Sequence, residues 1–81
     1  MKISPELDRI IDAVAEAKMH FTIAVGMKPG PERITELRLV TRSTVSAREL
    51  LPLIGGFDHL PRHIAVELRV CEMGVERLKM F

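Results

Sequence analysis

A short segment combines three residue types that bind metals or transfer protons. Asp58, His59 and His63 lie close together, and the two histidines are four positions apart. On a regular helix this spacing places two imidazoles on one side, where they can share a zinc ion. Pro61 lies between them, however, and interrupts such a helix. A structural zinc site also needs about four ligands, and Cys71 has no second cysteine beside it. We therefore expect no metal and no cofactor.

The single cysteine bears on both catalysis and compartment. Cys71 could act as a nucleophile only with a nearby base and an electropositive setting. His59 and His63 are the bases that would have to meet it in the fold. A cysteine in a core or a turn is far commoner, so we expect no enzymatic activity. One cysteine also excludes an internal disulfide and fits a reducing compartment, which predicts a cytoplasmic protein.

Two features suggest surfaces for a protein partner. Asp8, Asp12 and Glu16 are spaced i, i+4, i+8 and would form an acidic stripe on a helix. Like charges at this spacing slightly destabilise a helix, which makes the stripe a candidate contact surface. Lys28 and Arg33 flank a Pro-Gly-Pro turn that has little conformational freedom and could project from the molecule.

A set of basic residues suggests a second class of partner, nucleic acid. These residues fall on the open face of the sheet predicted below, and they are Arg38, Arg42, Arg69, Arg77 and Lys79. Arginine and lysine can contact phosphates. The chain lacks Trp and Tyr for base stacking, and its net charge is only +1. Nucleic-acid binding is therefore the alternative rather than the leading hypothesis.

Composition bounds the class of protein. The chain has 81 residues, of which 47% are hydrophobic and 28% are charged. These values fit one globular domain over residues 1–81 and exclude intrinsic disorder. No apolar run approaches the roughly 20 residues that a membrane helix needs, and no secretory signal pattern opens the chain. A domain this small has a marginal core, so self-association as a homo-oligomer is expected.

The first half of the chain predicts a helix followed by a β-hairpin. Ser4 and Pro5 form a helix start, and an apolar stripe follows over about residues 5–19. Residues 20–27 and 33–42 instead alternate between apolar and polar or small residues, as half-buried strands do. The Pro-Gly-Pro turn would join these two strands.

The second half of the chain predicts another helix, followed by a segment that fits either two strands or a helix. Ser46 and Glu49 match a capping box for a short helix over residues 46–54, which Pro52 would kink and Gly55-Gly56 would end. Residues 62–81 alternate at β-branched positions and contain Gly74, which favours two strands with a turn. They also fit a helix, with a heptad stripe at Ile64, Leu68, Cys71, Val75 and Leu78.

Together these patterns predict an α+β fold of order α-β-β-α-β-β, with two helices packed on one face of a small antiparallel sheet. The alternative order is α-β-β-α-α with a helical C-terminus, in which the last two helices would resemble a helix-turn-helix pair. The expected function is that of a small non-catalytic regulatory, adaptor or inhibitor domain. It would act by protein–protein interaction, self-associate as a homodimer and lie in the cytoplasm. The alternative is a nucleic-acid-binding regulator.

Overall fold

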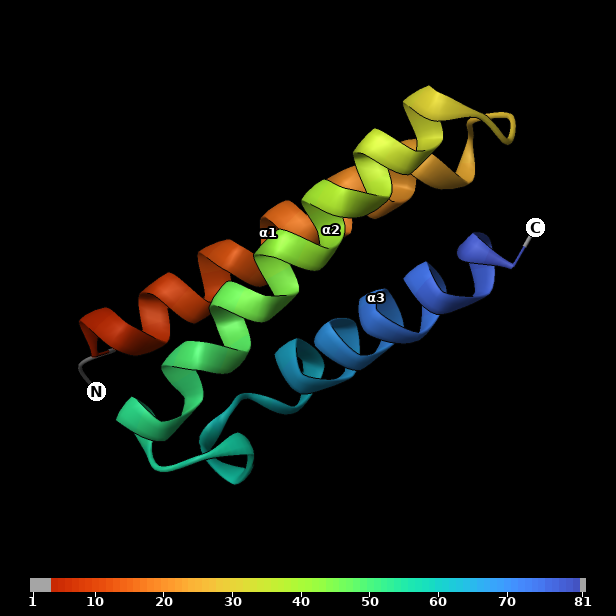
Figure 1. Cartoon of the computed structure of the whole chain (residues 1–81). Coiled ribbons are helices and arrows are strands. Elements are labelled where there is room, and N and C mark those ends of the chain that lie inside the picture. Colours follow the sequence, from red (N-terminus) through yellow and green to blue (C-terminus); the bar gives the residue numbers. More distant parts are fainter. Residues whose placement is uncertain (1–3, 81) are drawn as a thin grey trace.

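Three long helices form a rod in the computed structural model, which describes residues 4–80 (Figure 1). The helices are α1 (Pro5–Val25), α2 (Pro31–Leu50) and α3 (Arg62–Lys79), and two short 3-10 helices, η1 (Leu51–Ile54) and η2 (Phe57–His59), join α2 to α3. The helix α2 runs antiparallel to α1, and α3 returns in the same direction as α1 (Figure 1). The Cα atoms span 43 × 18 × 17 Å.

The start of α1 is the part of the fold that local sequence specifies best. The Leu7 backbone N–H donates a hydrogen bond of 3.1 Å to the Ser4 hydroxyl, and Pro5 occupies the first helical position. The predicted helix start is thus confirmed. The helix does not end near residue 19, however, and continues to Val25.

Each helix buries residues at alternating spacings of four and three. These buried or half-buried positions are Ile10, Val14, Ala17, Phe21 and Ala24 in α1; Arg33, Leu37, Val40, Thr44 and Ala47 in α2; and Ile64, Leu68, Cys71, Val75 and Leu78 in α3. Such a pattern keeps one stripe of each helix facing its neighbours. The bundle follows from three such stripes meeting along one axis.

The predicted α+β fold is wrong, because the described residues 4–80 contain no strand. Residues 20–27 form the end of α1 and the turn after it, and residues 33–42 lie within α2. Neither predicted order is therefore right, although the alternative's helical C-terminus is confirmed by α3. The threonines that favoured strands are accommodated in helices, because the hydroxyls of Thr22, Thr35 and Thr41 donate to the carbonyls four residues earlier.

The predicted short helix over residues 46–54 is also wrong. Its first residues are the last turn of α2, so Ser46 lies inside a helix rather than at an N-cap. Pro52 lies in η1, where a 3-10 turn follows the end of α2. The expected termination at Gly55-Gly56 is confirmed, since Gly55 has a φ of 93° and ends η1 in the left-handed region.

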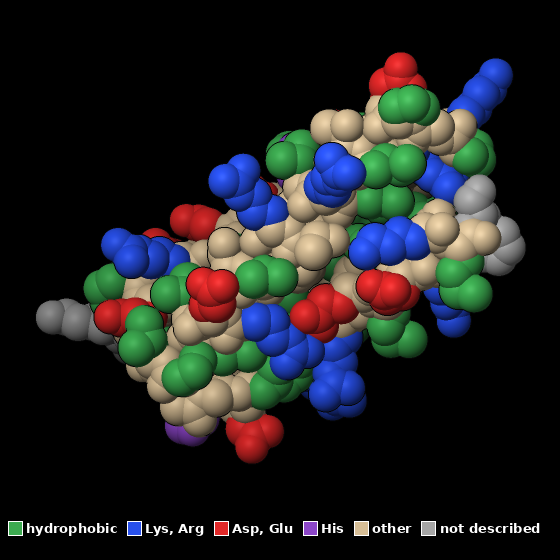
Figure 2. Space-filling view, in the orientation of Figure 1, with side chains coloured by type: hydrophobic (Ala, Val, Ile, Leu, Met, Phe, Trp, Pro, Cys, Tyr) green, Lys and Arg blue, Asp and Glu red, His purple; other side chains and the backbone are tan. Residues whose placement is uncertain are grey.

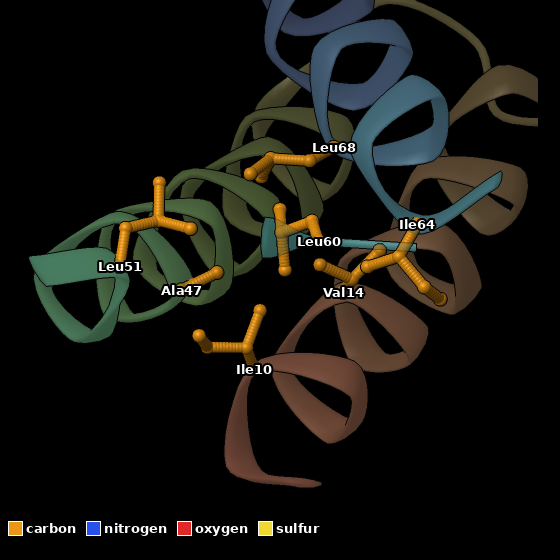
Figure 3. Packing of buried hydrophobic residues seen from close by; sticks show 7 residues of the cluster. All are labelled: Ile10, Val14, Ala47, Leu51, Leu60, Ile64 and Leu68. Atoms are coloured by element: carbon orange, nitrogen blue, oxygen red, sulfur yellow. The ribbon is translucent and has the colours of Figure 1, made fainter. Parts of the chain in front are cut away.

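The core divides into two clusters along the rod. Figure 3 shows the first cluster, near the α2–α3 connection, where Ile10 and Val14 of α1 face Ala47, Leu51, Leu60, Ile64 and Leu68. The second cluster lies toward the α1–α2 turn and contains Ala17, Ala24, Leu37, Val40, Cys71 and Val75. Phe21 and Leu78 pack against the second cluster.

Polar contacts tie each pair of helices together at the edges of the core. His20 Nδ1 lies 2.7 Å from Glu36 Oε2 between α1 and α2, and Lys18 Nζ lies 3.0 Å from Glu67 Oε1 between α1 and α3. Arg48 of α2 donates two hydrogen bonds of 2.8 Å to the two carboxylate oxygens of Glu72 in α3.

The ring of Phe57 extends this contact into η2. The guanidinium carbons of Arg48 and Arg69 lie 5.2 and 5.0 Å from the ring centroid. Both distances suit cation–π attraction. This contact links the connection between α2 and α3 to both helices.

Candidate functional site

A groove of about 540 Å³ opens between the start of α2 and the end of α3. We call it the α2/α3 groove, and its lining residues are Pro29, Gly30, Arg33, Ile34, Leu37, Arg38, Thr41, Leu78 and Lys79. Its volume lies within the range of roughly 300–1,000 Å³ that is typical of binding sites. In Figure 2 hydrophobic side chains lie between basic ones over this part of α2 and α3.

The floor of the α2/α3 groove is apolar. Leu37 is buried, Leu78 is half-buried, and Ile34 is 51% exposed. The 4-3 pattern explains this gradient, since Leu37 lies on the buried stripe of α2 and Ile34 lies beside that stripe. An exposed isoleucine beside a buried and a half-buried leucine gives an apolar ligand a surface to cover.

All three charged residues that line the α2/α3 groove are cations. Arg33 is only 8% exposed, and its Nη2 donates a hydrogen bond of 2.9 Å to the Leu78 carbonyl near the end of α3. This bond fixes the guanidinium at one wall of the groove. Arg38 is exposed, and Lys79 lies 3.7 Å from the Glu76 carboxylate. The groove therefore presents positive charge around an apolar floor.

The residues predicted to bind a protein partner do not form one surface. Asp8 and Asp12 are exposed on α1, whereas Glu16 lines a separate groove of about 320 Å³ between α1 and α2. Lys28 is exposed in the α1–α2 turn, which joins two helices rather than two strands. Arg33 was expected at an exposed hairpin tip, but it is buried at the edge of the bundle.

The residues predicted to bind nucleic acid are also dispersed, and the sheet face that was to carry them does not exist in residues 4–80. Arg38 and Lys79 meet in the α2/α3 groove. Arg42 lines the groove between α1 and α2, and Arg77 lines a third groove, between α1 and α3. Arg69 lies against the Phe57 ring. The five cations therefore face several sides of the rod.

The metal and thiol candidates lie in different surroundings. Asp58, His59 and His63 are exposed in η2 and the first turn of α3, whereas Cys71 is 2% exposed in the second core cluster. Burial raises the pKa of the Cys71 thiol, and the Glu67 carboxylate raises it further. The thiol is therefore held in its protonated, weakly nucleophilic form. Within residues 4–80, no three His, Cys, Asp or Glu side chains are grouped so that they could hold a metal ion.

The strand prediction concealed the α2/α3 groove. It placed Arg38 and Lys79 on the open face of a sheet, where no groove between helices could form. The signal that could have found the groove is the 4-3 spacing of Leu37, Val40 and Thr44, which places Ile34 and Thr41 together at one side of the buried stripe.

Comparison of the chain with protein-family models, with curated proteins and with solved structures finds no significant match. Among the described residues, no helix combines the length and the hydrophobicity needed to cross a membrane.

Proposed function

We propose that the protein is a small non-catalytic regulatory or adaptor domain that binds an amphipathic helical segment of another protein in the α2/α3 groove. One observation carries this proposal: an apolar floor is surrounded by charged residues that are all cations. The complementary segment presents large apolar side chains on one side and carboxylates beside them. The single cysteine supports placing this activity in the cytoplasm.

The shape of the groove favours a helix as the occupant. Two helices already form its walls, and an amphipathic helix can lay its apolar side into such a groove through anchors at i, i+3, i+4 and i+7. Arginine is suited to the polar part of the contact, because its planar guanidinium can bind a carboxylate through two parallel hydrogen bonds. Arg38, which is exposed on α2, would supply this contact.

Nucleic acid is less well supported as the ligand. Its backbone would need several cations along one track, whereas Arg42, Arg69 and Arg77 line different parts of the surface. An apolar floor also offers nothing to phosphates. A steep fall of affinity with salt for duplex DNA would nevertheless favour this alternative.

Two synthetic peptides test the proposal. Each has about 14 residues with the same leucine pattern at helical spacing, and they differ only in carrying Glu or Lys on the polar side. Titrated by fluorescence anisotropy, the Glu peptide should bind about tenfold more tightly, which corresponds to about 1.4 kcal/mol. In the Arg38→Glu/Lys79→Glu variant this preference should vanish or reverse.

The matched control is Arg42→Glu/Arg62→Glu, which changes the net charge equally but alters no residue of the α2/α3 groove. It should retain the preference for the Glu peptide. Equal binding of both peptides, or equal loss in the control, would contradict the proposal. Affinity capture from cells, with and without nuclease, can then identify a natural partner as one that survives nuclease and is lost in the groove variant.

A further inference from the structure

The cations of the α2/α3 groove are not matched by acids within the groove. Arg33, Arg38 and Lys79 line it, and none of its lining residues is acidic. The groove between α1 and α2 differs in this respect, because Glu16 lines it together with Arg42. The positive charge of the α2/α3 groove is therefore left for a ligand to neutralise.

One hydrogen bond fixes the two walls of the α2/α3 groove relative to each other. Arg33 Nη2 donates to the Leu78 carbonyl at 2.9 Å, and Lys79 is the next residue of α3. The last turn of α3 is thereby held against the first turn of α2. Lys79 consequently faces the groove from the α3 wall, while Arg38, which is exposed, faces it from the α2 wall.

Arg33 adds positive charge from behind these two side chains. It is only 8% exposed, and no carboxylate of residues 4–80 forms an ion pair with it. Its hydrogen bond goes to a carbonyl at the C-terminal end of α3, and such a helix end carries only about half a negative charge. Part of the guanidinium charge therefore stays uncompensated, although contact with a ligand falls to the exposed Arg38 and Lys79.

Two acids lie near the α2/α3 groove without lining it. The Glu32 carboxylate lies beside Gly30 at the start of α2, and the Glu76 carboxylate lies 3.7 Å from Lys79 Nζ. The side chains of Glu76 and Lys79 are 76 and 53% exposed. An exposed pair at this distance is weak, so Lys79 can exchange Glu76 for an anion that carries more charge.

We propose that the anionic group of the partner segment is the phosphomonoester of a phosphorylated serine, held between Arg38 and Lys79. This inference rests on the proposed function, because the same segment places its apolar side on the floor of the groove. A carboxylate has one charge and two oxygens, whereas a phosphomonoester has about −1.5 to −2 charges at pH 7 and three acceptor oxygens.

A phosphomonoester suits two cations that approach from two walls. The planar guanidinium of Arg38 can bind two of its oxygens through parallel hydrogen bonds, and the ammonium of Lys79 can bind the third. Recognition of phosphorylated segments by clustered basic residues follows the same chemistry. Phosphorylation of the partner then controls whether the partner occupies the α2/α3 groove.

A third peptide tests the proposal by fluorescence anisotropy. It is identical to the Glu peptide except that phosphoserine replaces one central Glu, and at about pH 7.5 it should bind about tenfold more tightly. At about pH 5.5, below the second phosphate pKa of about 6, most of this advantage should vanish, whereas the Glu peptide keeps its charge. No histidine lines the groove, so the pH dependence comes from the peptide.

Two single substitutions at exposed positions should change the preference for phosphoserine in opposite directions. Lys79→Gln should reduce it about fivefold, because one of the two cations is lost, while Arg38 should maintain the preference for the Glu peptide over the Lys peptide. Glu76→Gln should increase the preference for phosphoserine, because it removes the carboxylate that competes for Lys79. The matched control is Lys28→Gln, which removes the same charge outside the groove and should have no effect.

The outcomes separate this proposal from the proposed function. Equal or weaker binding of the phosphoserine peptide, with the Glu peptide still preferred over the Lys peptide, would overturn the phosphate site alone. A Lys peptide that binds as tightly as the Glu peptide would overturn the proposed function, and the phosphate site with it. Competition by inorganic phosphate or by a short single-stranded oligonucleotide, at the concentration of the peptide, would indicate a free anion or a nucleic acid and would also overturn the proposal.

Discussion

Gly74 lies in the middle of α3, where glycine usually weakens a helix. The tertiary structure explains why glycine occurs here, since a Cβ built at this position would clash with the ring of Phe21. The sequence shows a residue that disfavours a helix, but it does not show that the Phe21 ring needs a glycine at this position. It therefore suggested a turn between two strands, whereas Gly74 lets α1 and α3 approach closely.

Gly74→Ala should consequently destabilise the protein by about 1–2 kcal/mol. Alanine is the better helix former by about 1 kcal/mol, but the overpacking against Phe21 costs more than this gain. Urea denaturation measures the difference. In a Phe21→Ala background the same substitution should stabilise the protein, since the ring is gone. A stabilising effect of Gly74→Ala in the wild type would contradict the contact.

Arg33 and Ser4 show how far single residues can be predicted. The role of Ser4 depends on a backbone N–H only three residues away, so its N-cap position could be inferred from the sequence. Arg33 depends on the carbonyl of Leu78, which is 45 positions away. No local pattern indicates that partner, so an exposed arginine was predicted where the structure has a buried one.

At the level of elements, the first part of α1 was predicted correctly, the helix α3 was predicted only as the alternative to two strands, and α2 was predicted wrongly. The apolar stripes of α1 and α3 consist of ordinary hydrophobic residues at 4-3 spacing. In α2 the buried stripe includes Arg33 and Thr44, while Ile34 and Val45 are exposed. Because polar residues occupy buried positions and apolar residues occupy exposed ones, the helical period of hydrophobic residues is weak in α2. The alternation of apolar and polar residues is then the stronger signal, which is why a strand was predicted for residues 33–42.

The Arg48–Glu72 contact joins α3 to α2 at the edge of the core. Its hydrogen bonds to Glu72 raise the pKa of the Arg48 guanidinium, so Arg48 stays charged throughout the pH range in which proteins are usually studied. Two parallel hydrogen bonds to one carboxylate make a well-defined pair. The side chains are partly exposed, which limits the pair's contribution through solvent screening.

Glu72→Gln should lower the free energy of unfolding by about 0.5–1 kcal/mol, because one hydrogen bond from Arg48 is lost and the other no longer has an anionic acceptor. Urea denaturation at low salt gives this value, and the difference should shrink at high salt. Glu76→Gln is the matched control, since its side chain is 76% exposed and contacts Lys79 only at 3.7 Å. Equal losses in both variants would argue against a special role for Glu72.

At the scale of the whole molecule, the length and composition of the chain are enough to predict one small domain. They are not enough to predict how its helices are arranged. In the predicted fold, two helices would have covered one face of the sheet. Three helices in a rod leave long sides, and the outer side of α3 retains exposed apolar residues such as Val70 and Met73. The need to bury such a face depends on how α3 packs, which a pattern along one element does not reveal.

The small core predicts self-association, and in that case the thermal stability of the whole molecule should depend on concentration. Raising the protein concentration by about 100-fold should raise the Tm by several degrees, because association stabilises the folded state by mass action. Differential scanning calorimetry measures this shift. Val70→Glu puts a charge on an exposed apolar position of α3, where association would be expected to bury it, and should have a Tm that does not change with concentration. A wild-type Tm that is equally constant would count against dimerisation.

The position of Cys71 has a consequence for how the bundle opens. The only thiol of the chain lies on the inner side of α3, against residues contributed by α1 and α2. A reagent that modifies thiols can reach it only when α3 moves away from the other two helices. The rate at which Cys71 is modified therefore measures how often the bundle opens. A bulky adduct on this thiol would prevent α3 from packing against α1 and α2 again.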